Sequence, residues 1–265
     1  METVAGQADF GASGQDLMPR DASRLGGYAM LCYFSLSRLG AWRDGMLRDE
    51  LSRQVHAVGI SALPVVLTLA AITGATTVTQ AGALAGQDSD LTQRLLVFGL
   101  FFELAPLLTA LVIVARSSAT IASELAVMGV HDEFRALRRM GVPVAEYLML
   151  PRVAAMAVAL PVATALFQAV AVISGWIASA LLLNAPLFDI AARFFDFASP
   201  VVGIVSLAKA ACMGWLAGVV ATHHGSSSGR STQGVSSAAM QAVGGGLVAV
   251  FLVDIAFALL AYFLR

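Results

Sequence analysis

The chain has 265 residues, of which 58% are hydrophobic and 12% are charged. Soluble domains contain about 45–50% apolar and about 25% charged residues, so both values predict a membrane protein. The formal net charge of −1 excludes the surplus of basic surface that a nucleic-acid-binding protein needs.

The first part of the chain is polar. Residues 1–23 are rich in glycine and have no apolar run behind a basic start, so we expect a disordered tail rather than a cleaved signal peptide. Residues 25–55 carry apolar side chains at spacings of three and four among arginines, which predicts an amphipathic helix in the plane of a membrane interface. The alternative is a helix packed on the protein's own cytoplasmic face.

Five later stretches are long and apolar enough to cross a bilayer, which takes about 20 mostly apolar residues. The third is long for a hydrocarbon core of about 30 Å, so we expect it to tilt or to bend near Pro161. The predicted fold class is an all-α polytopic membrane protein. The five spans cover about residues 58–82, 95–115, 153–183, 201–221 and 243–263.

The arginines predict how these spans are oriented. With the N-terminus in the cytoplasm, twelve arginines fall in the inner segments and three in the outer segments. Cytoplasmic loops are enriched in positive charge, so this asymmetry favours a cytoplasmic N-terminus and a periplasmic C-terminus. The segment between the second and third spans is then cytoplasmic.

That segment contains a cluster of five charged residues at residues 131–140. Glu133 lies in the first turn of a predicted short helix and Arg138 lies in its last turn, which matches the helix dipole at both ends. Gly141 is placed to end this helix.

An apolar ridge runs along the same predicted helix. It consists of Phe134, Leu137 and Met140, at spacings of three. One reading is a juxtamembrane helix that rests on lipid headgroups. The other is an element that docks on a cytoplasmic partner, with the ridge in a groove and charges around it.

Three charged residues fall within predicted spans, where each costs several kcal/mol without a partner. They are Glu103, Lys209 and Asp254. Mutual pairing would hold the bundle together, whereas an ion path would make the protein a stand-alone secondary transporter or channel. Glu124, near the end of the second span, could pair with Arg116 or with an arginine of the 131–140 helix, or it could transmit motion from that helix.

The motifs that bind a nucleotide or a metal are absent from the sequence. It has no G-x-x-x-x-G-K-[ST], H-E-x-x-H or C-x-x-C pattern, so we expect neither nucleotide hydrolysis nor a resident cofactor. His223 and His224 precede the polar stretch GSSSGRSTQG, residues 225–234, within the expected 223–238 loop. They lack the acidic or cysteine partners of a metal site. Cys32 and Cys212 lie far apart in apolar surroundings, which favours buried free thiols.

Residues 121–153 read IASELAVMGVHDEFRALRRMGVPVAEYLMLPRV. This string resembles the signature region of the MlaE/YrbE-type permeases of Mce-associated ABC transporters. Phe134 replaces a glutamine of the family pattern, and Pro143 directly follows Val142 without an intervening aspartate. The matching residues are Glu124, Leu125, Met128, Glu133, Ala136, Leu137, Gly141, Val142, Tyr147, Leu148, Pro151 and Arg152.

The resemblance continues through the rest of residues 54–257. Residues 103–106, ELAP, are similar to an E-L-G-P motif, and Lys209 and Asp254 match charged residues of the family's last two spans. Ala239 and Met240 replace two threonines of the family's fifth-span motif. These replacements put any role of the 223–238 loop in doubt.

The resemblance implies a function. Residues 24–265 would form the permease domain of a homodimer in the bacterial inner membrane, and would move a phospholipid that supports outer-membrane lipid asymmetry. A cytoplasmic ABC ATPase would bind ATP and Mg²⁺, and an Mce-domain protein would lie on the periplasmic side. The implied lipid-cavity residues are Glu103, Leu104 and Pro106, and the implied ATPase-coupling residues are Glu133, Phe134, Leu137, Arg138 and Met140.

Overall fold

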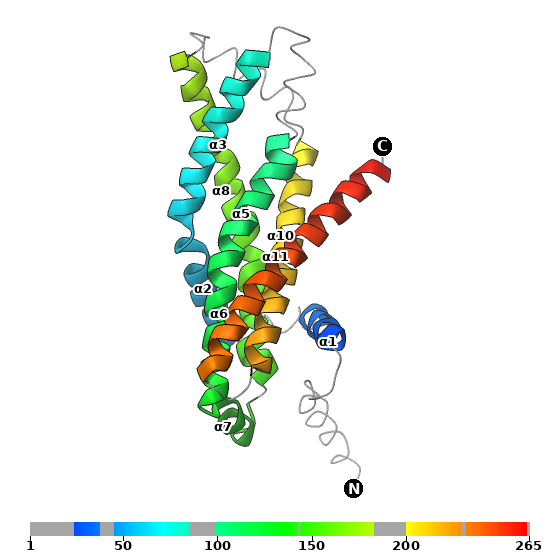
Figure 1. Ribbon diagram of the computed structural model, residues 1–265. Coiled ribbons are helices and arrows are strands. Elements are labelled where there is room, and N and C mark those ends of the chain that lie inside the picture. Colours follow the sequence, from blue (N-terminus) through cyan, green and yellow to red (C-terminus); the bar gives the residue numbers. More distant parts are fainter. Residues whose placement is uncertain are drawn as a thin grey trace.

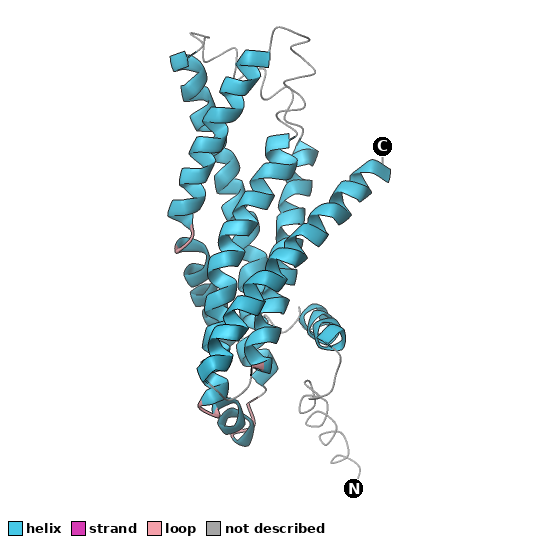
Figure 2. Ribbon diagram, viewed as in Figure 1, coloured by secondary structure: helices cyan, strands magenta, loops and turns pink. Residues whose placement is uncertain are grey.

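The computed structural model describes most of the chain, and within that part every regular element is a helix (Figure 2). Five of these helices are long and apolar enough to cross a membrane. The expected all-α polytopic class is therefore confirmed. The described residues are 24–37, 45–84, 99–142, 144–182, 200–228 and 232–263, so the expected tail at 1–23 lies outside them.

The expected interfacial segment, residues 25–55, contains two described helices rather than one. Helix α1 (Arg24–Ser37) is seen nearly end-on beside the long helices in Figure 1, so it lies across them. Helix α2 (Gly45–Ile60) packs on helix α8 and leads into α3 (Leu63–Leu84), which holds the first span at residues 63–80. Pro64 in the first turn of α3 has no N–H to donate, which explains a break between α2 and α3.

The second span continues well past its expected end at residue 115. Four consecutive helical segments run through residues 99–130, and the apolar part covers 102–130. Arg116 does not end the helix because its side chain lies on an exposed face, where a long aliphatic stem can carry the charge to water. The segments are η2 (Gly99–Leu104), α5 (Ala105–Ile113), η3 (Val114–Ser118) and α6 (Ala119–Val130).

A hairpin joins the second span to the third at the lower end of the bundle in Figure 1. It contains the short helix α7 (Glu133–Arg139) and the π-helical segment η4 (Ala145–Met149). Helix α8 (Leu150–Leu182) follows, and the third span covers residues 147–181. Pro161 lies inside α8, and the helix continues on both sides of it. We call residues 119–149 the α7 hairpin.

The last two spans are longer than expected at their shared end. Helix α10 (Pro200–Ser227) and helix α11 (Thr232–Phe263) leave only residues 228–231 between them, of which 229–231 are outside the described residues. Most of the expected 223–238 loop is therefore helical. The sequence suggested a loop because its serines and glycines have low helix propensity, but packing against α6 and α10 overrides that preference.

Helix α8 lies at the centre and packs against α3 and α10. Phe167, Met156 and Leu160 of α8 are fully buried. A Cβ added at Gly214 of α10 would overlap the backbone of Met156, so glycine permits the close approach of these two helices. The C-terminal half of α11 leans away from the other helices (Figure 1), and much of its apolar surface is exposed.

Candidate functional site

A charged cluster, defined as Glu103, Lys209 and Asp254, lies inside the bundle. The Lys209 side chain is fully buried on α10. Its Nζ is 2.8 Å from Oε2 of Glu103 on η2 and 2.6 Å from Oδ1 of Asp254 on α11. The three residues are far apart in sequence, so the cluster joins three membrane-spanning segments through one ammonium group.

The Lys209 ammonium has further contacts with Phe102. Its Nζ donates a hydrogen bond to the Phe102 carbonyl oxygen at 3.3 Å and lies 4.7 Å from the centre of the Phe102 ring. An ammonium has three N–H donors. Hydrogen bonds to Glu103 and to the Phe102 carbonyl use two of them, and Asp254 adds an opposite charge within ion-pair distance. This arrangement offsets much of the cost of burying the charge.

The charged cluster holds two carboxylates and one ammonium, so it carries one surplus negative charge when all three groups ionise. The three side chains differ in exposure: Lys209 is 0% exposed, Asp254 is 19% and Glu103 is 35%. Glu103 therefore presents the accessible carboxylate. It could accept hydrogen bonds from a polar or cationic group at the bundle surface.

The other two residues of the expected lipid cavity lie on different sides of the helix. Leu104 is 40% exposed and continues the surface next to Glu103. Pro106 is buried, so it does not line a surface. It instead follows the π-helical turn of η2, where a proline without an N–H is accommodated by irregular hydrogen bonding.

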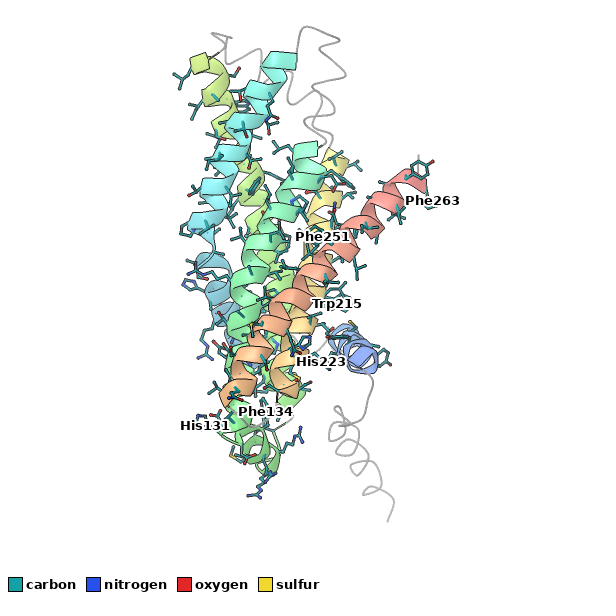
Figure 3. All side chains as sticks on the ribbon, in the orientation of Figure 1. His131, Phe134, Trp215, His223, Phe251 and Phe263 are labelled. Carbon is teal, nitrogen blue, oxygen red and sulfur yellow. The ribbon has the colours of Figure 1, made fainter. Side chains whose placement is uncertain are left out.

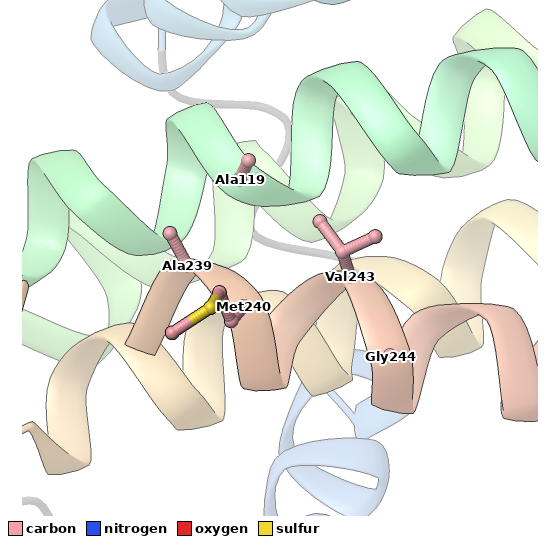
Figure 4. A pocket seen from close by; sticks show the side chains of 5 residues that line it. All are labelled: Ala119, Ala239, Met240, Val243 and Gly244. Atoms are coloured by element: carbon pink, nitrogen blue, oxygen red, sulfur yellow. The ribbon is translucent and has the colours of Figure 1, made fainter. Parts of the chain in front are cut away.

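An apolar groove lies elsewhere, between α6 and α11 (Figure 4). It has a volume of about 450 Å³ and contains none of the residues expected to line a lipid cavity. Met240 is 68% exposed, and a Cβ added at Gly244 would meet no atom within 4 Å. Sequence reasoning missed this groove because it depends on how two spans cross. Its lining residues are Ala119, Ala239, Met240, Val243 and Gly244.

Helix α7 begins two residues later than expected, because Asp132 adopts a left-handed conformation with a φ of 56°. No residue of α7 is buried. Glu133 and Arg138 are exposed, and Met140 just after the helix is 68% exposed. These side chains form an accessible charged surface at one end of the bundle.

The expected apolar ridge of α7 does not point in one direction. Phe134 is partly buried and packs against the main core, facing Gly129 of α6 (Figure 3). Leu137 is partly buried, whereas Met140 faces outward. Met140 is the residue after the end of α7 and has a non-helical backbone conformation, so it does not continue the face of Phe134 and Leu137. Phe134 therefore attaches α7 to the bundle.

At the base of the α7 hairpin, Glu124 pairs with neither of the expected kinds of partner. Its Oε2 lies 3.2 Å from Nη2 of Arg152 at the start of α8. The Arg152 side chain is 6% exposed and that of Glu124 is 50% exposed. The sequence identified Arg152 only as a match to the family pattern, because a contact across 28 residues leaves no local pattern.

Helix α1 is attached to α10 by polar aromatic contacts. The Tyr28 hydroxyl is 2.9 Å from Nε2 of His224, and the Tyr28 and His223 ring centres are 4.5 Å apart. Figure 3 shows His223 on α10 close to α1. Trp215 Nε1 also donates to Ser35 Oγ at 2.9 Å. The two histidines thus pack against α1. Cys32 and Cys212 are free thiols, but the expectation that they are buried is wrong, because Cys32 is only partly buried and Cys212 is exposed.

Comparison with known proteins assigns the chain to a family. Residues 51–260 match the family described as Permease MlaE. A probable ABC transporter permease protein of Rickettsia felis is 26% identical over 226 residues, covering 84% of this chain and 86% of that protein. One from Synechocystis sp. is 30% identical over 152 residues, or 57% of each chain.

A plant relative also matches. Protein TRIGALACTOSYLDIACYLGLYCEROL 1, chloroplastic, of Arabidopsis thaliana is 28% identical over 174 residues, covering 62% of this chain and 46% of that protein. The family match extends over well more than half of the chain. The chain is therefore a member of the MlaE permease family, and it is a permease of an ABC transporter.

Proposed function

We propose that this permease moves phospholipids in the bacterial inner membrane, driven by ATP hydrolysis in a separate ABC ATPase. An Mce-domain protein exchanges lipid with it on the periplasmic side, which supports outer-membrane lipid asymmetry. The family match over residues 51–260 carries this proposal. The name of the Arabidopsis relative is that of a glycerolipid, which favours a lipid as cargo.

In this proposal, α7 is the docking element for the ATPase. Its exposed Glu133 and Arg138, together with Met140, offer charge around a single apolar contact. Such a combination suits a protein groove with a polar rim. Phe134 has a different role. It packs α7 against the bundle, so a displacement of α7 also moves α6.

The lipid contacts the permease at Glu103 and Leu104 in this proposal. Glu103 offers an accessible carboxylate beside an exposed apolar side chain, which matches the mixed chemistry of a headgroup and its acyl chains. Lys209, which is itself paired with Asp254, holds that carboxylate in place from the interior of the bundle. Their role is to position Glu103.

The functional unit is a homodimer in this proposal. The groove between α6 and α11 is apolar and contains small residues, which permit close packing of another helix. The exposed apolar surface of α11 continues beyond it. These features favour α11 as the helix that meets the second copy.

The N-terminus and α7 lie on the cytoplasmic side in this proposal, and the C-terminus is periplasmic. The arginine asymmetry of the sequence supports this orientation. Helix α1 lies across the long helices at the same half of the bundle as α7 (Figure 1), as a helix at the cytoplasmic interface would.

Docking is tested by purifying the permease together with its ATPase. We expect the double variant Arg138→Glu/Met140→Asp to lose most of the copurifying ATPase, because both side chains are exposed on the docking surface. Arg53→Glu is the matched control, since Arg53 is an exposed arginine on α2. Undiminished copurification of the double variant would contradict docking through α7.

Lipid contact at Glu103 is tested by native mass spectrometry of the complex with phosphatidylethanolamine. We expect Glu103→Gln to lower lipid occupancy, since it removes the accessible carboxylate but keeps the size of the side chain. Glu50→Gln, outside the apolar spans, is the control. Equal occupancy in both variants would place the lipid elsewhere.

A further inference from the structure

Arg152 is a nearly buried cation at the point where the α7 hairpin meets α8. Its side chain is 6% exposed. Nη2 donates to Glu124 Oε2 of α6 at 3.2 Å, and Nη1 donates to the Leu148 carbonyl oxygen of η4 at 3.0 Å. One guanidinium thus connects the helix that enters the hairpin with the segment that leaves it.

A third segment, α2, approaches the same guanidinium. Burial of the Glu50 carboxyl opposes its ionisation, but hydrogen bonds from Gln54 and Arg53 and the charges of Arg53 and Arg152 outweigh this, so the pKa of Glu50 is lowered. Glu50 also accepts hydrogen bonds at 2.7 Å from Arg53 and at 2.9 Å from Gln54. Helix α2 packs against α8, which carries Arg152, and the charge of Arg152 acts on Glu50 of α2.

Helix α7 itself is held by few contacts. None of its residues is buried, and Phe134 is the side chain that packs against the main core. The helix is flanked by two residues with positive φ, Asp132 at 56° and Gly141 at 77°. A force applied to α7 must therefore reach the spans through the two arms of the hairpin, α6 and η4.

We infer that the Glu124–Arg152 pair clamps these two arms, so that they move as one body with α8 when α7 is displaced. Arg152 is thus a positioning residue for energy coupling. This inference rests on the proposed function, because it needs an ATPase that acts on α7. Without the clamp, a displacement of α7 would splay the arms, and α6 and the start of α8 would move independently.

The chemistry of the pair fits a role in positioning better than one in stability. Ion pairs with a buried member add little net stability, because desolvation offsets their attraction, but they favour one arrangement of the segments they join. Within the part of the chain that the structure describes, Arg152 Nε is buried without a hydrogen-bond partner, so the pair leaves one of its buried donors unsatisfied.

The test compares wild-type permease with Glu124→Gln in the complete complex with its ATPase, reconstituted in vesicles of phosphatidylethanolamine and phosphatidylglycerol. Glu124 is half exposed, so its neutral isostere should fold. We expect unchanged copurification of the ATPase and ATP hydrolysis within about twofold. We expect the amount of lipid transferred per ATP hydrolysed to fall at least about fivefold. A factor of about five is the low end of typical coupling between two sites.

Arg53→Gln is the matched control, since it neutralises an exposed charge in the neighbouring helix α2. It should keep the wild-type ratio of lipid to ATP. A wild-type ratio in Glu124→Gln would overturn the clamp. If the wild-type complex transferred no lipid on ATP addition, the proposed function would fail instead, and that result differs from a selective failure of Glu124→Gln.

A distance measurement between α6 and η4 tests the clamp independently of lipid transport. Spin labels are placed at Thr120 on α6 and Tyr147 on η4, both exposed, in a background with Cys32→Ser and Cys212→Ser. Their separation should give one narrow distribution in the parent and a clearly broader one in Glu124→Gln. An equally narrow distribution in both proteins would show that the pair does not hold the arms together.

Discussion

The charged cluster in the bundle and the Glu124–Arg152 pair both place a buried cation against carboxylates, but in opposite settings. Lys209 is fully enclosed and contacts groups from two other spans, both held within the helical bundle. Arg152 faces a half-exposed Glu124 on a hairpin that turns through two left-handed residues. The charged cluster therefore fixes the arrangement of the spans. The Glu124–Arg152 pair instead controls how the α7 hairpin is attached to α8.

The largest loss of stability is expected on replacing Lys209. Replacing Lys209 with Met leaves two carboxylates without their cation, so we expect a loss of stability of about 3–5 kcal/mol, measured by denaturant unfolding in detergent. The triple variant Lys209→Met/Glu103→Gln/Asp254→Asn removes all three charges and should recover much of that loss. A Lys209→Met protein as stable as wild type would show that the cluster does not hold the spans.

Arg152→Gln should have a smaller effect on stability. The substitution leaves Glu124 unpaired, but that carboxylate is half exposed and water can solvate it. We expect a loss of about 1–2 kcal/mol, mainly from hydrogen bonds to a charged group. A loss as large as that of Lys209→Met would erase the distinction between the two sites, and denaturant unfolding of both variants checks it.

The smallest effect is expected at Glu50. Its ion pair with Arg53 lies within one helix and its partner is 76% exposed, so solvent screens the interaction. Glu50→Gln should change Tm by no more than about 2 °C in a thermal scan. A larger drop would show that Glu50 acts through Arg152, and the clamp would then include α2.

The sequence predicted what depends on local composition and on the cost of buried charge. Glu103, Lys209 and Asp254 were expected to need partners, since lipid offers none, and the structure brings them together. The number of spans followed from apolar run lengths. The ends of the spans could not be predicted in this way. Arg116 was expected to lie beyond the second span, but it lies on an exposed face of a helix that continues. His223 and His224 were expected in a loop, but they lie within a helix.

Contacts between distant segments could not be predicted in the same way. The partner of Glu124 lies 28 residues away, whereas the sequence favoured Arg116 or an arginine of α7. Phe134 was expected to face a partner, but Gly129 leaves room for its ring against α6. The α6–α11 groove depends on the crossing of two spans, which no run of residues encodes locally.

ATP-driven lipid transfer by the reconstituted complex tests the central claim most directly. Permease and ATPase are incorporated into vesicles with a fluorescent phospholipid, and transfer to an Mce-domain acceptor is followed with ATP and with a non-hydrolysable analogue. We predict transfer in either direction that requires ATP hydrolysis and is lost in the docking variant Arg138→Glu/Met140→Asp. Transfer that is independent of ATP, or absent from the intact complex, would contradict the assignment of a lipid-moving ABC permease.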